Sequence, residues 1–218
     1  MCILHNTIIH GDCIKALPML HSDSVDFILT DPPYLANYTS RDGRGVPNDD
    51  NSTWLKPAFR EIYRVLKADS FCVSFYGWPH ADKFMEAFKQ AGFRIVGHLM
   101  FPKRYASSKR FLAYQHEAAY LLAKGEPARP EQPIGDVIAW QYTGNRYHPT
   151  QKPLAVLSPL IEAFSKPGDV VLDPFAGSGS SLLAAQRAGR SYIGIELSAE
   201  YHRIATQRLI EPPLRKAA

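Results

Sequence analysis

The segment 30–34, with the sequence TDPPY, carries the groups that hold a planar amine. It follows the apolar run 25–29, which predicts a buried strand, and its two prolines end strand and helix alike. We therefore expect a stiff corner at a strand end, where ligands bind in open α/β sheets. The Asp31 carboxylate, the free Pro32 carbonyl and the Tyr34 ring would face the ligand. A plain turn with a capping aspartate is the alternative.

A glycine-rich loop at 173–180, with the sequence DPFAGSGS, is the second stretch suited to chemistry. It follows the apolar run 170–172 and precedes a predicted helix. Glycines let the backbone approach a ligand closely at a helix N-terminus. Glu196 ends the next predicted strand, where a carboxylate can accept hydrogen bonds from ribose hydroxyls. The unit therefore predicts a nucleoside site.

Three ligand classes use this geometry, and the residues after the loop separate them. Gly179 is followed by Ser180 and Ser181, without the lysine of a Walker A phosphate loop. Leu182 stands where a dinucleotide fingerprint has its third glycine, which weakens that assignment. The pattern Asp-Pro-Phe-x-Gly-x-Gly fits a site for S-adenosylmethionine (SAM), which has no phosphate to hold.

Composition limits the remaining classes. The 218 residues suit a single domain, and a net charge of +4 does not by itself argue for nucleic-acid binding. Cys2, Cys13 and Cys72 are widely spaced, without a Cys-x-x-Cys pair, so we expect no metal site and a reducing, cytoplasmic location. No apolar run approaches the length of a membrane span, so no membrane partner is expected.

Hydrophobic periodicity predicts alternating strands and helices, as in a doubly wound α/β sheet. Strands are expected near 6–12 and at 25–30, 71–76, 94–101, 117–122, 170–172 and 192–195. Helices are expected at 14–20, 54–66, 81–91, 154–164 and 181–188, with a last helix between 198 and 210. Three stretches stay outside this pattern and are read as loops: 35–53, 102–115 and 124–147.

The loop at 102–115 has the strongest local positive charge of the three. It interleaves basic and aromatic side chains with no acid until Glu117, which is typical of a nucleic-acid patch. A solvated hairpin tip is the alternative. The candidate DNA-binding residues are Lys103, Arg104, Tyr105, Lys109, Arg110 and Tyr114.

Three motifs occur in a fixed order along the chain, and together they are far more specific than any one alone. They are Asp31-Pro32-Pro33-Tyr34, then His148-Pro149-Thr150-Gln151-Lys152-Pro153, then Asp173-Pro174-Phe175-Ala176-Gly177-Ser178-Gly179. With these motifs the chain resembles SAM-dependent amino-methyltransferases of DNA, in the beta-class arrangement. The resemblance covers nearly the whole chain and departs mainly in its short, variable middle.

The resemblance implies a Rossmann-like SAM-dependent methyltransferase fold with a mostly parallel, seven-stranded sheet. It also implies a circular permutation, because the Asp-Pro-Pro-Tyr half precedes the glycine-loop half. Joining the two ends would restore an unbroken run of βα units. We expect one catalytic domain over 1–218, with a small target-recognition region at about 102–147.

The resemblance also assigns roles within the site. Asp31 and the Pro32 carbonyl would accept the two N–H bonds of the target amine, and Tyr34 would stack on the base. Lys152 would lie near the methionine carboxylate of SAM, and Asp12 near its adenine. The catalytic set is Asp31, Pro32, Pro33 and Tyr34; the cofactor set is Asp12, His148, Thr150, Lys152, Asp173, Phe175, Gly177, Ser178, Gly179 and Glu196.

The resemblance predicts methylation of the adenine N6 amine in double-stranded DNA. Asp31 favours adenine, because relatives that act on cytosine N4 more often carry Ser-Pro-Pro-Tyr. Cytosine-N4 methylation is the first alternative; a nucleotide-dependent oxidoreductase and an inactive DNA-binding protein follow. A homodimer is expected by analogy, and the sequence leaves open whether a restriction endonuclease is a partner.

Overall fold

A seven-stranded sheet runs through the molecule in the order β1-β9-β8-β2-β3-β7-β4. The computed structural model describes residues 5–37, 47–109, 111–142, 147–148 and 150–210. The sheet strands are β1 Thr7–His10, β2 Val25–Thr30, β3 Leu66–Phe75, β4 Arg94–Pro102, β7 His116–Lys124, β8 Val170–Asp173 and β9 Ser191–Glu196. A separate small hairpin pairs β5 (Ser108–Lys109) with β6 (Ala113–Tyr114).

The sheet is mostly parallel, as predicted. Strands β1, β9, β8, β2 and β3 pair in parallel, whereas β7 is antiparallel to both β3 and β4. The Rossmann-like α/β architecture is therefore confirmed. Strand β1 pairs with β9, with His10 beside Glu196. These two strands would follow each other in sequence if the two chain ends were joined. The circular permutation itself stays a prediction.

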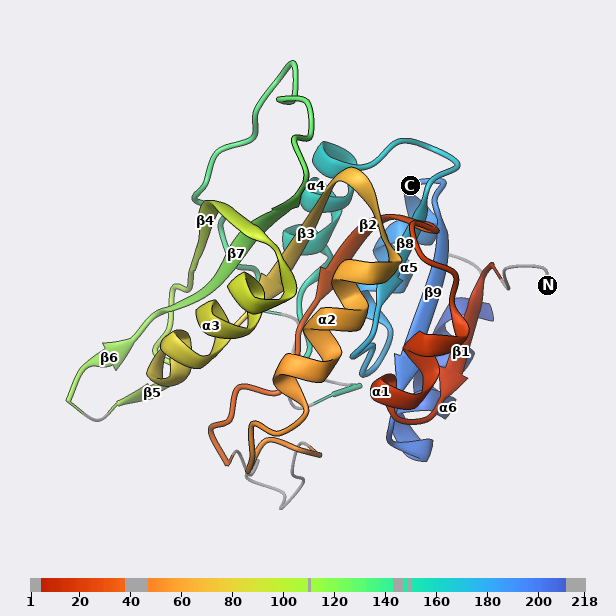
Figure 1. The fold of residues 1–218 in the computed structure, drawn as a ribbon. Helices are drawn as coiled ribbons and strands as arrows, with labels where there is room; N and C mark the ends of the chain where they lie inside the picture. Colours follow the sequence, from red (N-terminus) through yellow and green to blue (C-terminus); the bar gives the residue numbers. More distant parts are fainter. Residues whose placement is uncertain (1–4, 38–46, 110, 143–146, 149, 211–218) are drawn as a thin grey trace, which may run out of the picture.

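Helices cover both faces of the sheet (Figure 1). The helices are α1 Cys13–Ala16, α2 Leu55–Val65, α3 Ala81–Ala91, α4 Leu154–Phe164, α5 Ser180–Arg187 and α6 Ala199–Ile210. Helices α1, α2 and α3 lie on one face, and α4, α5 and α6 lie on the other.

Alternation along β2 explains how one strand serves two cores. Ile28 packs in the core under α2 and α3, whereas Phe27 and Leu29 pack in the core under α4 and α5. Successive side chains of a strand point to opposite faces, so a strand buried on both sides is apolar throughout. The continuous apolar run of this strand is therefore the signature of a central position in the sheet.

Strand β3 begins at Leu66, five residues before the predicted start at 71. Residues 67–69 are exposed and comprise a lysine, an alanine and an aspartate, so the sequence carries no strong apolar signal for this part of the strand. Pairing of Leu66 with Val25 and a register shift before Phe27 extend the strand through this exposed stretch.

The chain between β4 and α4 makes two excursions at the edge of the sheet. The hairpin β5–β6 projects from the body between the end of β4 and the start of β7 (Figure 1). Residues 136–140 then run along β4: Met100 donates to the Asp136 carbonyl, and Ile138 and Trp140 donate to carbonyls of β4. This path returns the chain from the end of β7 to the other end of the sheet, where β4 ends and β7 begins.

No described helix is long and apolar enough to cross a membrane. No group of three or more His, Cys, Asp or Glu side chains in the described part is arranged to hold a metal ion. The cytoplasmic location expected from the cysteines stays a prediction.

Candidate active site

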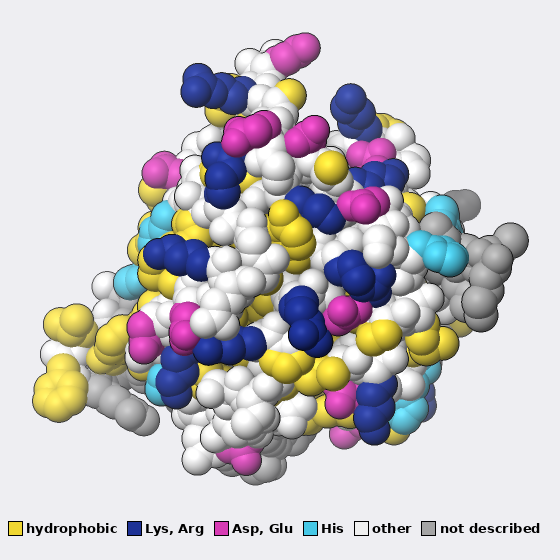
Figure 2. Space-filling model, viewed as in Figure 1, with side chains coloured by type: hydrophobic (Ala, Val, Ile, Leu, Met, Phe, Trp, Pro, Cys, Tyr) yellow, Lys and Arg dark blue, Asp and Glu magenta, His cyan; other side chains and the backbone are white. Residues whose placement is uncertain are grey.

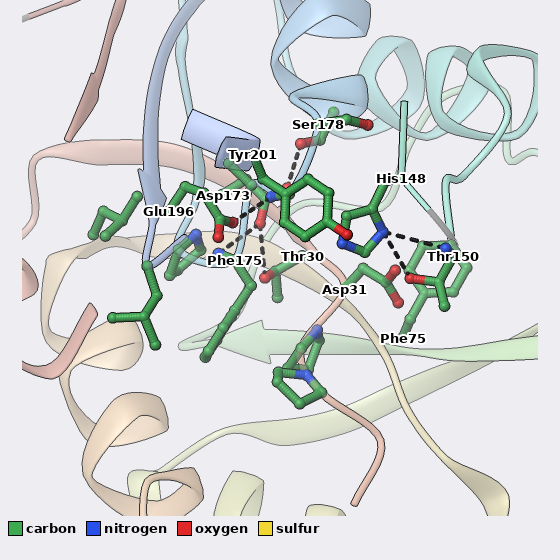
Figure 3. Close-up of a pocket in the computed structure, with 18 of the residues that line it drawn as sticks. Thr30, Asp31, Phe75, His148, Thr150, Asp173, Phe175, Ser178, Glu196 and Tyr201 are labelled. Atoms are coloured by element: carbon green, nitrogen blue, oxygen red, sulfur yellow. Dashed lines mark hydrogen bonds between the residues drawn. The ribbon is translucent and has the colours of Figure 1, made fainter. Parts of the chain in front are cut away.

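A pocket opens at the carboxyl ends of β2, β8 and β9, and all three sequence motifs line it (Figure 3). The corner at 31–34 forms one wall, the loop at 173–178 forms another, and His148 and residues 150–152 lie between them. Tyr201 of α6, Glu196 of β9 and Asp12, at the start of α1, also line the pocket. The fold therefore brings together segments that are widely separated in the sequence.

Asp173 anchors the glycine-rich loop. Its Oδ1 accepts hydrogen bonds from the Phe175 backbone N–H at 3.0 Å and from the Thr30 hydroxyl at 3.0 Å, and its Oδ2 accepts one from the Ser181 hydroxyl. Burial raises the pKa of Asp173 to about 7, although all three donors favour the charged form. Asp173 therefore shapes the loop and links it to β2.

The two glycines of this loop adopt left-handed backbone conformations. Gly177 has φ of +51° and Gly179 has φ of +76°, values that residues other than glycine rarely adopt. A side chain at Gly179 would also meet Ala205 of α6, whose Cβ lies 3.0 Å from the added carbon. The loop therefore needs glycine at 179 for its backbone and for its packing.

Glu196 lies at the end of β9 with both carboxylate oxygens engaged. Its Oε2 accepts from the Gly177 N–H at 2.7 Å, and its Oε1 accepts from the Ser198 N–H at 2.7 Å. Burial raises the pKa of Glu196, and these two N–H groups oppose that rise. Each carboxylate oxygen has two lone pairs, so the fixed carboxylate keeps acceptor capacity for ligand hydroxyls.

The remaining cofactor residues occupy other parts of the wall. Asp12 accepts from the Ile14 N–H at 3.0 Å, capping α1, and also lines the pocket. His148 Nδ1 lies 3.2 Å from the Thr150 backbone nitrogen and 3.0 Å from its hydroxyl oxygen. The His148 ring packs against Tyr201 with centroids 4.3 Å apart. Pro149 of this motif lies outside the described residues.

Asp31 presents one bound and one free oxygen. Its Oδ2 accepts from Lys152 Nζ at 2.5 Å, whereas its buried Oδ1 has no hydrogen-bond partner among the described residues. Burial raises the pKa of Asp31, and the adjacent Lys152 opposes that rise. A buried acceptor without a partner is costly, so Oδ1 is suited to a donor brought by a ligand.

Lys152 occupies a different place from the one that the resemblance implied. Its ammonium is buried against Asp31 and lies 5.1 Å from the Tyr34 ring centroid and 4.9 Å from that of Phe75. In the structure Lys152 therefore belongs to the corner at 31–34. Its contact with a methionine carboxylate stays a prediction.

Lys103 is not the surface cation expected from the sequence. It is buried, pairs with Glu117, and donates to the Ser107 hydroxyl at 2.8 Å. Its ammonium also lies 4.7 Å from the Trp140 ring centroid. The segment 102–115 lacked an acid of its own, but β7 supplies one directly afterwards, so this amine is already neutralised.

The other residues of the predicted DNA-binding set lie in or near the projecting hairpin. Arg104 and Tyr105 are exposed, and Lys109 belongs to β5. Tyr114 of β6 stacks on the exposed Trp78, with ring centroids 5.7 Å apart. Arg110 lies outside the described residues.

Sequence analysis missed four residues that contact the site. Thr30 binds Asp173, Phe75 contacts Lys152, Glu117 accepts from the Tyr34 hydroxyl at 3.3 Å, and Tyr201 packs on His148. Thr30 ends a predicted strand and Phe75 is the last residue but one of another, so their positions carried a signal. Glu117 and Tyr201 carried none, because their approach depends on how distant elements pack.

The residues of this pocket fit a bound SAM. The glycine loop leaves space beside a backbone at a helix start, Glu196 offers fixed acceptors, and Phe175 and Tyr201 provide aromatic walls. The fold and this pocket define a SAM-dependent methyltransferase. The chain belongs to the DNA methylase family, whose N6/N4 model matches residues 25–207.

Named relatives agree with this assignment. The chain is 55% identical over 201 residues to YubD of Escherichia coli (strain K12), covering 92% of this chain and 88% of YubD. It is 32% identical over 248 residues to the DNA adenine methyltransferase YhdJ of the same strain, covering 93% of this chain and 82% of YhdJ. The crystal structure of the M1.HpyAVI–SAM complex has a TM-score of 0.76 at 24% identity, covering 94% of this chain and 99% of that one.

Gly77 provides a test of how tightly the corner is held. A Cβ at this position would lie 2.5 Å from the Tyr34 carbonyl oxygen and 2.8 Å from its Cβ, so the corner at 31–34 must shift in a Gly77→Ala variant. A displacement on the order of 1 Å costs about 100-fold in rate. We expect the methyl-transfer rate to fall by about this factor, while calorimetry shows SAM affinity within about twofold of wild type.

Gly135→Ala is the matched control. A Cβ there meets nothing closer than the Val137 carbonyl oxygen at 4.0 Å. This variant should keep the wild-type rate. Equal rates for Gly77→Ala and the control would show that the corner tolerates the added carbon.

Proposed function

We propose that this DNA methyltransferase acts on the exocyclic N6 amine of adenine. The observation that carries the proposal is the buried Asp31 Oδ1, which has no hydrogen-bond partner among the described residues; Asp31 lines the same pocket as the glycine loop and Glu196. An amine donor and a SAM held in this pocket would lie side by side. The proposal rests on the catalytic assignments of Asp31, Pro32, Pro33 and Tyr34, which the sequence motif suggested.

The amine of a nucleobase is a poor nucleophile, because its lone pair is delocalised into the ring. Acceptance of its two N–H bonds by Asp31 Oδ1 and the Pro32 carbonyl favours a pyramidal nitrogen with an available lone pair. Bound SAM supplies an electrophilic methyl group. The chain contributes by positioning the amine and stabilising the positive charge that develops on nitrogen, and one N–H proton is then released.

Tyr34 supports the base in this scheme. Burial raises the pKa of Tyr34 well above its usual value, so the hydroxyl keeps its proton. The hydroxyl donates a hydrogen bond to Glu117. A target base must leave the duplex stack to reach such a pocket, and a fixed aromatic ring replaces part of the lost stacking.

Two observations favour adenine over cytosine. The first residue of the motif is Asp31, where relatives acting on cytosine N4 more often have serine. YhdJ, which is 32% identical, is named a DNA adenine methyltransferase. Cytosine N4 remains the second candidate, because the matching family model covers both amines. The oxidoreductase loses its support with membership of a methylase family. The inactive DNA-binding protein would be a member of the same family, and absence of methyl transfer on any DNA would favour it.

The test is mass spectrometry of nucleosides from DNA incubated with the protein and SAM. We expect N6-methyladenine. N4-methylcytosine without N6-methyladenine would overturn the choice of base. Single-stranded DNA and RNA, treated in parallel, establish which nucleic acid is the substrate.

Replacing Asp31 separates amine binding from cofactor binding. Asp31→Ala and Asp31→Asn both remove the carboxylate, so we expect methyl transfer to fall by roughly 100-fold or more. SAM affinity should stay within about threefold by calorimetry, because Glu196 and the glycine loop lie on other strands. Asp82→Asn, at an exposed position of α3, is the control. Loss of SAM binding with an unchanged rate per bound cofactor would assign Asp31 to the cofactor instead.

We also propose that the hairpin region contacts DNA. Trp78 is 60% exposed and stacks on Tyr114, and Phe111 and Leu112 are 98% and 68% exposed. Figure 2 shows hydrophobic side chains gathered at the end of this projection. Apolar side chains of this kind fill or wedge base steps, and cations such as Arg104 contact phosphates.

Salt dependence tests the cationic part of this surface. A variant with Arg104→Ala and Lys109→Ala should bind a methylatable duplex more weakly, and its log–log salt slope should fall by about 2, since each lost phosphate contact removes about 1. Fluorescence anisotropy across a salt series measures both effects. SAM affinity should not change.

The control carries Lys166→Ala and Arg187→Ala, which remove the same charge at the end of the sheet where β8 begins, away from the pocket. Lys166 precedes β8 and Arg187 ends α5, and both are exposed. The control should keep the wild-type slope. An equal loss of slope in both variants would show a net-charge effect and not a local contact.

A further inference from the structure

Four charged side chains form a chain of alternating sign behind the corner at 31–34. Lys103 pairs with Glu117, Lys152 pairs with Asp31, and the Tyr34 hydroxyl donates to Glu117 Oε2 at 3.3 Å. The two lysine side chains are only 6% exposed, and the side chains of Asp31 and Glu117 are 22% and 21% exposed. Such a cluster carries no net charge.

The two ion pairs are coupled through Lys152. Burial raises the pKa of Glu117, but Lys152 and Lys103 more than offset this and hold its pKa below the usual range. Glu117 in turn acts on Asp31 as a like charge that raises its pKa. Lys152 therefore serves both carboxylates, and the ionisation of Asp31 depends on Glu117.

We propose that Glu117 is a positioning residue for methyl transfer, which holds the Tyr34 ring through its hydroxyl and shares Lys152 with Asp31. This inference rests on the proposed function of the corner at 31–34. Without Glu117 the Tyr34 hydroxyl would lose this acceptor and be left with Asp31, and the Lys152 ammonium would be left to Asp31 alone. Glu117 contacts neither reacting atom; it acts through Tyr34 and Lys152.

Two substitutions separate the two parts of this role. Glu117→Gln keeps an acceptor oxygen at the same reach and removes the charge. Glu117→Asp keeps the charge and shortens the reach to the Tyr34 hydroxyl. A purely structural glutamate would make both variants less stable without moving the pH dependence of the rate.

The pH profile of the rate is the principal measurement. In the proposed role the ionised Asp31 carboxylate accepts the N–H hydrogen bond of the amine, so the rate rises with pH through the pKa of Asp31. Removing the like charge of Glu117 lowers that pKa, so the acid limb of Glu117→Gln should move to lower pH by about one unit. Glu117→Asp should keep the wild-type limb.

The titration of Asp31 depends on every charged or titratable group that faces it. Lys152, Glu117, Tyr34 and Asp173 act on it directly, and Lys103 faces Glu117. The other titratable groups that line the pocket are Asp12, Cys13, Asp49, His148, Glu196 and Tyr201. None of these changes between wild type and Glu117→Gln, so the shift in the limb reports the altered residue.

The rate at the pH optimum tests the second part of the role, the orientation of Tyr34 by Glu117. Glu117→Asp should lower kcat by roughly tenfold with KM for SAM unchanged, because Tyr34 loses its fixed orientation. Glu126→Gln is the control, since Glu126 follows the same strand, is 84% exposed and pairs only with Arg94 among the described residues. It should match wild type in limb and rate.

Folding is controlled with a compensated variant. If Glu117→Gln does not fold, Lys103→Met with Glu117→Gln removes the pair together, which buried pairs often tolerate. That double variant should show the same shift of the acid limb. An unmoved limb in a folded variant, together with an unchanged kcat in Glu117→Asp, would overturn the inference while wild-type methyl transfer still supports the proposed function. A wild-type chain without methyl transfer would overturn both.

Discussion

The hydrogen bond from the Thr30 hydroxyl to Asp173 joins the two halves of the site. Thr30 ends β2 just before the corner at 31–34, and Asp173 ends β8 just before the glycine loop. Because β2 and β8 are neighbouring parallel strands, their ends lie side by side. A slip of one residue between them would turn side chains to the opposite face and separate the amine acceptor from the cofactor loop.

Four carboxylates in the pocket and directly behind it are each held by a different set of donors. Asp173 is held by two hydroxyl groups and one N–H, Glu196 by two backbone N–H groups, and Asp31 and Glu117 by lysines. A SAM sulfonium is positively charged, so a pocket rich in acceptors suits it. Lys152 opposes the rise that burial causes in the pKa of Asp31, and Lys152 and Lys103 hold the pKa of Glu117 below its usual value.

The sequence predicted the parts of the site that are written in contiguous motifs. The corner at 31–34, the glycine loop and Glu196 were found because prolines, glycines and strand ends constrain the chain locally. Lys103 was misjudged, since its partner Glu117 lies beyond the segment that was weighed for charge. The positions of Glu117 and Tyr201 depend on strand order and helix packing, which no local pattern encodes.

The reversed direction of β7 has a consequence for how such an enzyme diversifies. Because β4 ends and β7 begins at the pocket edge of the sheet, everything inserted between them emerges beside the reacting centre. The sheet pairing of β4 and β7 closes behind this insertion and does not depend on its length. The projecting hairpin is thus a part of the chain whose length can change while the sheet and the corner at 31–34 stay in place.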